Sequence, residues 1–301
     1  MSASSRAAGA LERAARRQEA SAAAVLLGPA TILVCVMMLA PLALLARYSL
    51  NRFDPIKLMI AAVTAENYVR FFSDSFDLSV LVTTIRVSVI CTAVCLLLGI
   101  PIAWRLARTE SRWKSAYVML IVLPLFIGST IRTAGWMILF ARGGMLDILA
   151  GALFGRHGID LMYTETAVIA GIISIDLPFA ILILQSVFEG IDPRLEEAAA
   201  SMGAAPGKSF FRIVMPLSLS GVLICGVLCF ILTMNAFPTP LLLGGPRFHM
   251  MAPLLYWEFS TNNNWPFAGA LAFILMATTL ALTLIATVAV PRRYRVGRAG
   301  G

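Results

Sequence analysis

The sequence predicts an all-α integral membrane protein with six transmembrane helices, and its composition is the first reason. Hydrophobic residues make up 59% of the 301 positions, charged residues make up only 13%, and the mean hydropathy is +0.85. A soluble domain averages roughly 45–50% apolar and about 25% charged residues, so this composition fits a chain whose surface faces lipid. The net charge of +8 does not indicate nucleic acid as a partner, because the basic residues lie at the ends of apolar stretches rather than in one patch.

Six apolar stretches are the second reason, because each is long enough to supply the roughly 20 helical residues that cross the hydrocarbon core. We predict spans at about 24–46, 80–104, 115–140, 165–188, 217–237 and 267–290. They form one transmembrane domain over 23–290, between an Ala- and Arg-rich tail over 1–22 and a basic tail over 291–301. A signal peptide has an apolar core of only about 7–15 residues, so the longer first stretch is predicted to be an uncleaved anchor.

The distribution of Lys and Arg predicts how these spans are oriented. Outside the spans, 15 basic residues fall on the side that holds both tails and 7 fall on the opposite side. Basic residues accumulate on the cytoplasmic side of a membrane, so both termini are expected in the cytoplasm. The segment 238–264, which mixes Pro, Gly and apolar residues, is then external, and we expect it to fold back against the bundle.

The cysteines and histidines do not indicate a metal site. The cysteines lie inside apolar stretches without a neighbouring His or acidic residue, so we expect them to pack between helices as small apolar side chains. They are Cys35, Cys91, Cys95, Cys225 and Cys229. His157 and His249 fall in outer loops without companions, and no ligand role is expected of them.

The loop over 189–216, between the fourth and fifth stretches, predicts two short helices that lie outside the membrane. Asp192 is a good N-cap for the first helix, and Gly203 is a natural left-handed stop at its end. A second helix is expected to run from Pro206 until Pro216 ends it. The Ala-rich first half leaves a low surface that another protein can approach closely.

This loop resembles the "EAA" loop of ABC-importer permeases, which reads Glu-Ala-Ala, three residues, Gly, nine residues, Ile, any residue, Leu-Pro. The matching positions are Glu197, Ala198, Ala199, Gly203, Ile213 and Pro216, while Met215 replaces the usual Leu. In this family the loop is the coupling helix that docks into a groove of the ATPase subunit. The resemblance therefore implies that Glu197 is the docking carboxylate, facing a basic partner, and that Gly203 is the elbow between the two helices.

The segment from Gly203 to Ser209 also looks like a phosphate-binding P-loop, but it does not fit that motif. The motif needs four residues between its glycines and this segment has three, and no buried strand precedes it. We therefore expect no ATP site and no cofactor in this chain, with ATP used by a partner subunit. No catalytic constellation appears elsewhere, so the chain is not expected to be an enzyme.

Further segments resemble the spermidine/putrescine type of permease, over roughly residues 25–290. They are Glu66-Asn67-Tyr68, Pro101-Ile102-Ala103, Ile131 to Met137 through Arg142-Gly143-Gly144, Leu177-Pro178-Phe179, Leu243-Gly244-Gly245 and Trp265-Pro266-Phe267. The resemblance implies the type I importer fold, with five core spans after one N-terminal helix, in the inner membrane of a bacterial cell. It also implies alternating access with a second homologous permease, two ATP-binding subunits and a periplasmic solute-binding protein.

The same branch resembles importers of opines, ferric iron and sulfate, so the solute stays open between these and a polyamine. A secondary transporter is the rival from another class, but it needs paired interrupted helices and an ion site, and no such repeat is present.

Two charged residues lie near the middle of predicted spans, where a charge costs at least about 2.5–3.5 kcal/mol and needs a partner or a pathway. Arg132 interrupts the third span and Asp176 the fourth, two residues before Pro178. Either they pair as a structural lock, or they line the translocation path, where a carboxylate suits a cationic solute. Arg86 lies near a span end, where we expect it to snorkel towards water. Trp136, Trp257 and Trp265 are expected to be interface anchors.

Overall fold

The computed structural model describes residues 28–154 and 161–289, and within them the predicted helical class is confirmed. The only β pairing in this part is a single bridge between Arg52 and Ile60. The two predicted tails, the start of the first predicted span and His157 lie outside the described residues.

The first described helix is an N-terminal helix over Gly28–Ser49. The longer ones are α2 Glu66–Ser73, α3 Ser75–Ala107, α4 Lys114–Val122, α5 Ser129–Phe140, α6 Met145–Phe154, α7 Glu165–Glu189, α8 Arg194–Ser201, α10 Met215–Met234, α12 Met251–Ser260 and α13 Trp265–Ala289. The short ones are η1 Leu123–Phe126, α9 Pro206–Ser209, η2 Phe210–Val214, α11 Pro238–Leu243 and η3 Gly245–Arg247. Within the described residues, five helices are long and apolar enough to cross a membrane, and the bent pair Lys114–Phe126 and Ser129–Leu149 makes a sixth if it counts as one span.

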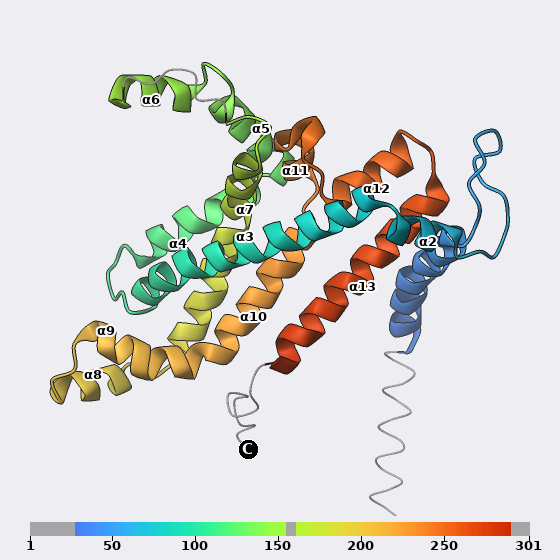
Figure 1. Ribbon diagram of the computed structural model, residues 1–301. Coiled ribbons are helices and arrows are strands. Elements are labelled where there is room, and N and C mark those ends of the chain that lie inside the picture. Colours follow the sequence, from blue (N-terminus) through green and yellow to red (C-terminus); the bar gives the residue numbers. More distant parts are fainter. Residues whose placement is uncertain (1–27, 155–160, 290–301) are drawn as a thin grey trace, which may run out of the picture.

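The centre of the bundle is formed by α3, α7 and α10, which cross one another in Figure 1. Their contact surfaces carry small side chains, including Cys95, Ala180, Cys225 and Cys229, all of them almost fully buried. Small side chains let membrane helices approach closely. The predicted packing role of these cysteines is therefore confirmed, whereas Cys35 is exposed on the N-terminal helix.

The third predicted span is not the single helix that its apolar run suggests. The chain turns by 94° between the helical segments Lys114–Phe126 and Ser129–Leu149. Pro124 lies in the short 3₁₀ turn η1, and Ile127 and Gly128 then adopt non-helical backbone conformations before α5 begins. Proline disfavours a continuing helix and glycine gives the chain freedom to turn. As a result Arg132 lies one turn after the break rather than in the middle of a straight helix.

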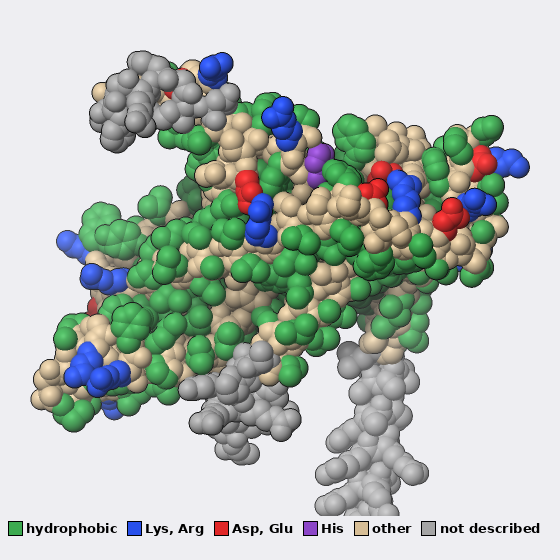
Figure 2. All heavy atoms as spheres, viewed as in Figure 1, with side chains coloured by type: hydrophobic (Ala, Val, Ile, Leu, Met, Phe, Trp, Pro, Cys, Tyr) green, Lys and Arg blue, Asp and Glu red, His purple; other side chains and the backbone are tan. Residues whose placement is uncertain are grey.

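The surface has the pattern expected of a membrane protein. Hydrophobic side chains cover a broad flank of the bundle, while acidic and basic side chains gather along one edge, near α2, α5 and α12, and basic side chains lie at the opposite tip, near α8 (Figure 2). Arg86 does more than snorkel towards water, because it forms an ion pair with Glu165 at 2.6 Å. The N-terminal helix is exposed along most of its length and touches α13 near Gly269.

Candidate functional site

The coupling loop, residues 189–216, lies at one tip of the bundle and consists mainly of α8, α9 and η2 (Figure 1). Its first helix, α8, begins at Arg194, with Pro193 rather than the predicted Asp192 at the N-cap, but the Oδ1 atom of Asp192 accepts a hydrogen bond from the N–H of Arg194 at 2.9 Å. A side chain in this position satisfies one of the N–H groups that a helix start leaves without a partner. The start of α8 is therefore determined by local sequence.

The left-handed turn predicted at Gly203 ends α8. Gly203 has a φ of +82°. The N–H of Ala204 donates to the carbonyl of Ala199 at 3.0 Å, and the N–H of Gly203 donates to the carbonyl of Ala200 at 2.9 Å. These two bonds form the Schellman motif, in which glycine avoids the steric penalty of a Cβ atom. A Cβ at Gly203 would meet no atom within 4 Å, so the backbone conformation alone favours glycine here.

Two adjacent carboxylates of α8 have different surroundings. The Oε1 atom of Glu196 lies 2.7 Å from the Nε atom of Arg108, and the two side chains are only 17% and 19% exposed. Arg108 also donates from Nη1 to the carbonyl of Phe188 at 3.1 Å, so it joins α8 to the ends of α3 and α7. Glu197 is exposed and forms no ion pair with any described residue. Its carboxylate is therefore accessible to another protein.

The other matching positions of the loop divide between its surface and its interior. Ala198 is exposed, whereas Ala199 is only 4% exposed and Ile213 is partly buried. The ring of Phe210, at the start of η2, lies 4.7 Å from the ring of Trp104 between centroids. This aromatic contact holds η2 against α3. The exposed face of α8 is thus supported by Ala199 and η2, which pack against the bundle.

The structure corrects the predicted end of the second loop helix at Pro216. The helix that begins at Pro206 continues without interruption to Met234, so the fifth span starts inside the coupling loop. The turn Phe210–Val214 is π-helical and leads directly into α10, where Pro216 occupies one of the first two positions. In this π turn the N–H of Met215 donates to the carbonyl of Phe210, five residues back, and the changed pattern lets the helix pass Pro216, which has no N–H to donate. The proline therefore does not break this helix.

Arg132 and Asp176, the two candidate residues of the translocation path, do not form a direct ion pair, which was one of the two alternatives for them. No nitrogen of Arg132 lies within 4.0 Å of a carboxylate oxygen of Asp176, although the two side chains interact electrostatically. Asp176 is 4% exposed, and its Oδ2 atom accepts a hydrogen bond from the Oγ1 of Thr233 at 2.8 Å. Arg132 points its Nη1 atom at the carbonyl of Ser174 at 3.5 Å, and its Nε atom is buried without a hydrogen-bond partner.

The half-span that carries Arg132 is attached to its neighbours by polar contacts that sequence reasoning missed. Trp136 donates from Nε1 to the Oγ of Ser174 on α7 at 2.8 Å. The hydroxyls of Thr133 and Thr239 lie 3.0 Å apart and join α5 to α11. The indole N–H of Trp136 thus bonds inside the protein, unlike that of an interface anchor. Trp257 and Trp265, expected in the same role, are 54% and 39% exposed.

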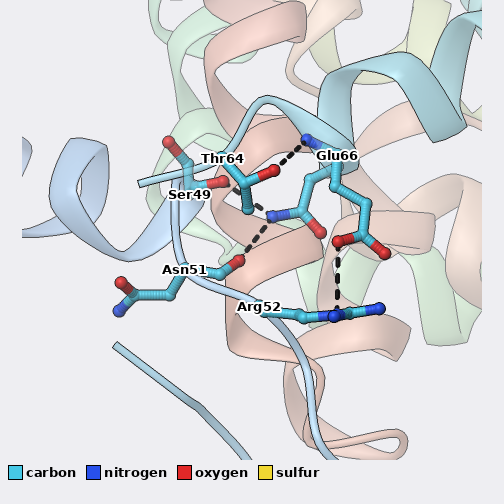
Figure 3. Close-up of polar contacts among 6 residues, drawn as sticks. Ser49, Asn51, Arg52, Thr64 and Glu66 are labelled. Carbon is cyan, nitrogen blue, oxygen red and sulfur yellow. Dashed lines mark hydrogen bonds and ion pairs between the residues drawn. The ribbon is translucent and has the colours of Figure 1, made fainter. Parts of the chain in front are cut away.

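The Glu66-Asn67-Tyr68 segment joins the end of the N-terminal helix to the rest of the molecule. Figure 3 shows its polar contacts around Ser49, Asn51, Arg52, Thr64 and Glu66. The amide of Asn67 is buried and donates to the carbonyls of Ser49 at 2.7 Å and Asn51 at 2.9 Å. Glu66 lies 3.3 Å from Arg52, and the hydroxyl of Tyr68 lies 2.9 Å from that of Ser49. A three-residue segment therefore fixes where the N-terminal helix attaches.

Comparison with known proteins places these features in a family. Residues 59–295 match the family described as "binding-protein-dependent transport system inner membrane component". The spermidine/putrescine transport system permease protein PotB of Haemophilus influenzae is 33% identical over 221 residues, which cover 71% of this chain and 76% of that protein. The molybdenum transport system permease protein ModB of Azotobacter vinelandii is 34% identical over 170 residues, covering 56% and 74%.

The fold is also that of a solved transporter. A chain of the bacterial alginate ABC transporter, in complex with an alginate pentasaccharide-bound periplasmic protein, superposes with a TM-score of 0.76. The match covers 94% of this chain and 98% of that one at 17% sequence identity, so it supports the fold alone. With the family match over most of its length, this chain belongs to the binding-protein-dependent transport system inner membrane components and is the permease component of an ABC importer.

Proposed function

We propose that this permease imports a polyamine such as spermidine or putrescine, and that separate ATP-binding subunits dock on its coupling loop. The observation that carries the docking assignment is the contrast within α8, where Glu196 is bound internally and Glu197 is exposed beside a glycine elbow. The polyamine assignment is supported by the 33% identity to a spermidine/putrescine permease over most of the chain.

The packing of the coupling loop supports a route by which ATPase motion reaches the spans. Arg108 connects α8 to α3 and, through the carbonyl of Phe188, to α7. The helix that starts at Pro206 runs directly into α10. A displaced α8 therefore acts on all three central helices, as an alternating-access cycle requires. The assembly we propose has two ATP-binding subunits, a second homologous permease and a periplasmic solute-binding protein, with both termini of this chain cytoplasmic in the inner membrane of a bacterial cell.

The geometry of the elbow supports ATP binding by the partner rather than by this chain. In a P-loop, backbone N–H groups are free to surround a phosphate. Here the N–H groups of Gly203 and Ala204 are already bonded to carbonyls of α8. These bonds support our proposal that ATP is bound by the partner subunit rather than by this segment.

Asp176 and Arg132 remain our candidates for the translocation path. Asp176 lies between α7 and α10, and Arg132 lies beside it on the half-span that follows the 94° break. A buried carboxylate bound to a single hydroxyl can exchange that bond for an ammonium group as the solute passes. The Asp176→Asn permease should therefore show lower polyamine uptake, with unchanged docking of the ATPase.

The test of the solute is uptake by the complete importer in proteoliposomes, with its binding protein outside and ATP inside. Labelled spermidine and putrescine should accumulate, while molybdate, sulfate, ferric iron and opines should not. The identity to a molybdenum permease makes an oxyanion the specific rival. Accumulation of molybdate without either polyamine would refute the polyamine assignment.

A further inference from the structure

A cavity lies between α11, η3, α12 and the start of α3, at the end of the bundle away from the coupling loop (Figure 1). Its volume is about 560 Å³, which falls in the range of roughly 300–1,000 Å³ that is usual for small-molecule sites. Its walls include Phe76, Phe248, Trp257, His249, Glu258 and Asn262. We call it the α11–α12 pocket.

The carboxylate of Glu258 gives this pocket its electrostatic character. Glu258 is only 8% exposed, and its Oε1 atom accepts a hydrogen bond from Asn262 at 3.1 Å. Its Oε2 atom accepts no hydrogen bond from a described residue, and no Lys or Arg of the described chain lies within 4.0 Å. A buried carboxylate without a counter-ion is costly, because it has lost water and gained no opposite charge.

A second buried acid increases the negative charge next to the pocket. Asp77 is 4% exposed, interacts electrostatically with Glu258 and Asp74, and forms no ion pair with a described residue. The cation that acts on Asp77 is Arg70, but the Arg70 guanidinium is placed over the ring of Phe267, 4.1 Å from its centroid. Around Asp77 one cation thus faces three acids, so negative charge is in excess on the Glu258 side of the α11–α12 pocket.

The aromatic walls narrow the chemistry of the ligand. Phe76, Phe248 and Trp257 line the same pocket as Glu258. Aromatic faces attract organic cations by a cation–π interaction, and they also pack against methylene groups. A hydrated metal ion would gain little from such walls, whereas an alkylammonium ion uses both the charge and the rings. We propose that the α11–α12 pocket binds an organic ammonium cation, with Glu258 as its counter-ion.

The walls of the pocket are held in place before any ligand arrives. The N–H of Met251, at the start of α12, donates to the buried hydroxyl of Thr84 on α3 at 2.9 Å. The backbone N–H of Asn264 donates to the carbonyl of Glu258 at 2.9 Å and fixes the turn after α12. Binding therefore needs little ordering of the protein, which favours affinity.

The ligand class agrees with the proposed import of polyamines. The choice of putrescine as the probe rests on that proposed function. Putrescine carries an ammonium group at each end of an apolar chain, so one end can meet Glu258 while the chain lies against the rings. The test is a titration of the purified importer in lipid nanodiscs with putrescine, without nucleotide or binding protein, followed by tryptophan fluorescence. Trp257→Phe keeps an aromatic wall and removes the reporter, so the difference from wild type isolates the signal of the pocket.

We expect a saturable signal in the wild type and a Kd at least tenfold higher in Glu258→Gln, which keeps the shape and the Asn262 contact but removes the charge. Phe76→Leu should raise the Kd about threefold. The matched control is Glu66→Gln, which removes an acid on the same side of the molecule but outside the pocket and should leave the Kd unchanged. The uncharged analogue 1,4-butanediol should give no signal.

An equal Kd in wild type and Glu258→Gln, or an equal response to butanediol, would overturn the proposal. The result is independent of the proposed function, because the titration requires neither transport nor ATP. If the importer takes up molybdate and no polyamine but still binds putrescine in the titration, the polyamine assignment is wrong and the proposed pocket is supported. If the importer takes up polyamines but putrescine gives no fluorescence change in the titration, the polyamine assignment is supported and the proposed pocket is wrong.

Discussion

At the α8 end of the bundle, Glu196 lies 2.7 Å from Arg108, whereas at the α12 end neither Glu258 nor Asp77 has a cation within 4.0 Å in the described chain. All three acids are largely buried. At the first end the charge is neutralised inside the protein, and an adjacent carboxylate, Glu197, remains outside for a partner. At the second end the unbalanced acids adjoin a cavity. The difference suggests that one end is built to hold a fixed shape and the other to accept a positive charge.

The difference is also one of rigidity. The coupling loop is defined by backbone bonds, an ion pair and the aromatic contact of Phe210 with Trp104. We expect these contacts to carry a displacement of α8 to α3 and α7. The α11–α12 pocket instead keeps an open volume of about 560 Å³. Mutations that test the first end should change coupling, and mutations that test the second should change the binding of a cation.

The largest expected effect concerns orientation, because the comparison requires the two ends to face opposite sides of the membrane. Asn263 is exposed in the turn after α12. In a variant whose five native cysteines are replaced by serine or alanine, Asn263→Cys should react with a membrane-impermeant maleimide in whole cells. Labelling that appears only after permeabilisation would reverse the topology and with it the assignment of α8 to the cytoplasm.

Glu197→Lys should produce the next largest effect. If the exposed carboxylate faces a basic groove of the ATPase, reversal of its charge creates repulsion that grows as the interface loses water. We expect at least a tenfold loss of ATPase subunit in a pull-down, with normal insertion of the permease. Undiminished binding and transport would show that Glu197 does not lie in the docking surface.

Glu196→Gln should affect stability rather than docking. Removal of its charge leaves the Arg108 guanidinium in a largely buried position with a weaker partner, and such a loss costs about 1–3 kcal/mol. The expected result is a lower midpoint of thermal unfolding for the purified permease complex. Glu197→Gln is the matched control, since it removes the neighbouring charge from an exposed position and should leave the midpoint unchanged. Equal midpoints for both variants would contradict the distinction between the two carboxylates.

The features that the sequence predicts correctly are those specified by neighbouring residues. Asp192 bonds the first N–H of α8 and Gly203 ends the helix, because such side-chain bonds and left-handed turns depend on residues within a few positions. The long apolar helices follow from composition in the same way. Sequence alone therefore locates the first loop helix and assigns the left-handed turn at its end to one residue.

The features that the sequence misses depend on contacts between distant segments. Arg108 and Glu196 are separated by 88 positions, and the sequence indicates Arg108 only as one of several basic residues near a span end. Pro216 is a reasonable helix stop by local rules, but a π turn packed against α3 carries the chain through it. The break after Pro124 lies within the uncharged run 115–131, so hydropathy does not reveal it. The α11–α12 pocket likewise joins residues from four elements, which no local pattern brings together.

The smallest expected effect, and the most specific test of the rigid end, concerns Gly203. At a φ of +82° any Cβ atom is penalised by about 1–2 kcal/mol, and a β-branched side chain adds further strain. Because a Cβ atom at this position would have no neighbouring atom within 4 Å, the penalty comes from the backbone and not from a clash. Gly203→Ala should therefore weaken solute-stimulated ATP hydrolysis slightly and Gly203→Val more strongly, with normal membrane insertion in both. Gly207 offers the matched control, since it lies in α9 with equally open surroundings but an ordinary helical backbone, so Gly207→Ala should be neutral. If the importer with Gly203→Val hydrolyses ATP as well as the wild type, the left-handed elbow is not needed for coupling. The claim that the α8 end must hold a fixed shape is then wrong.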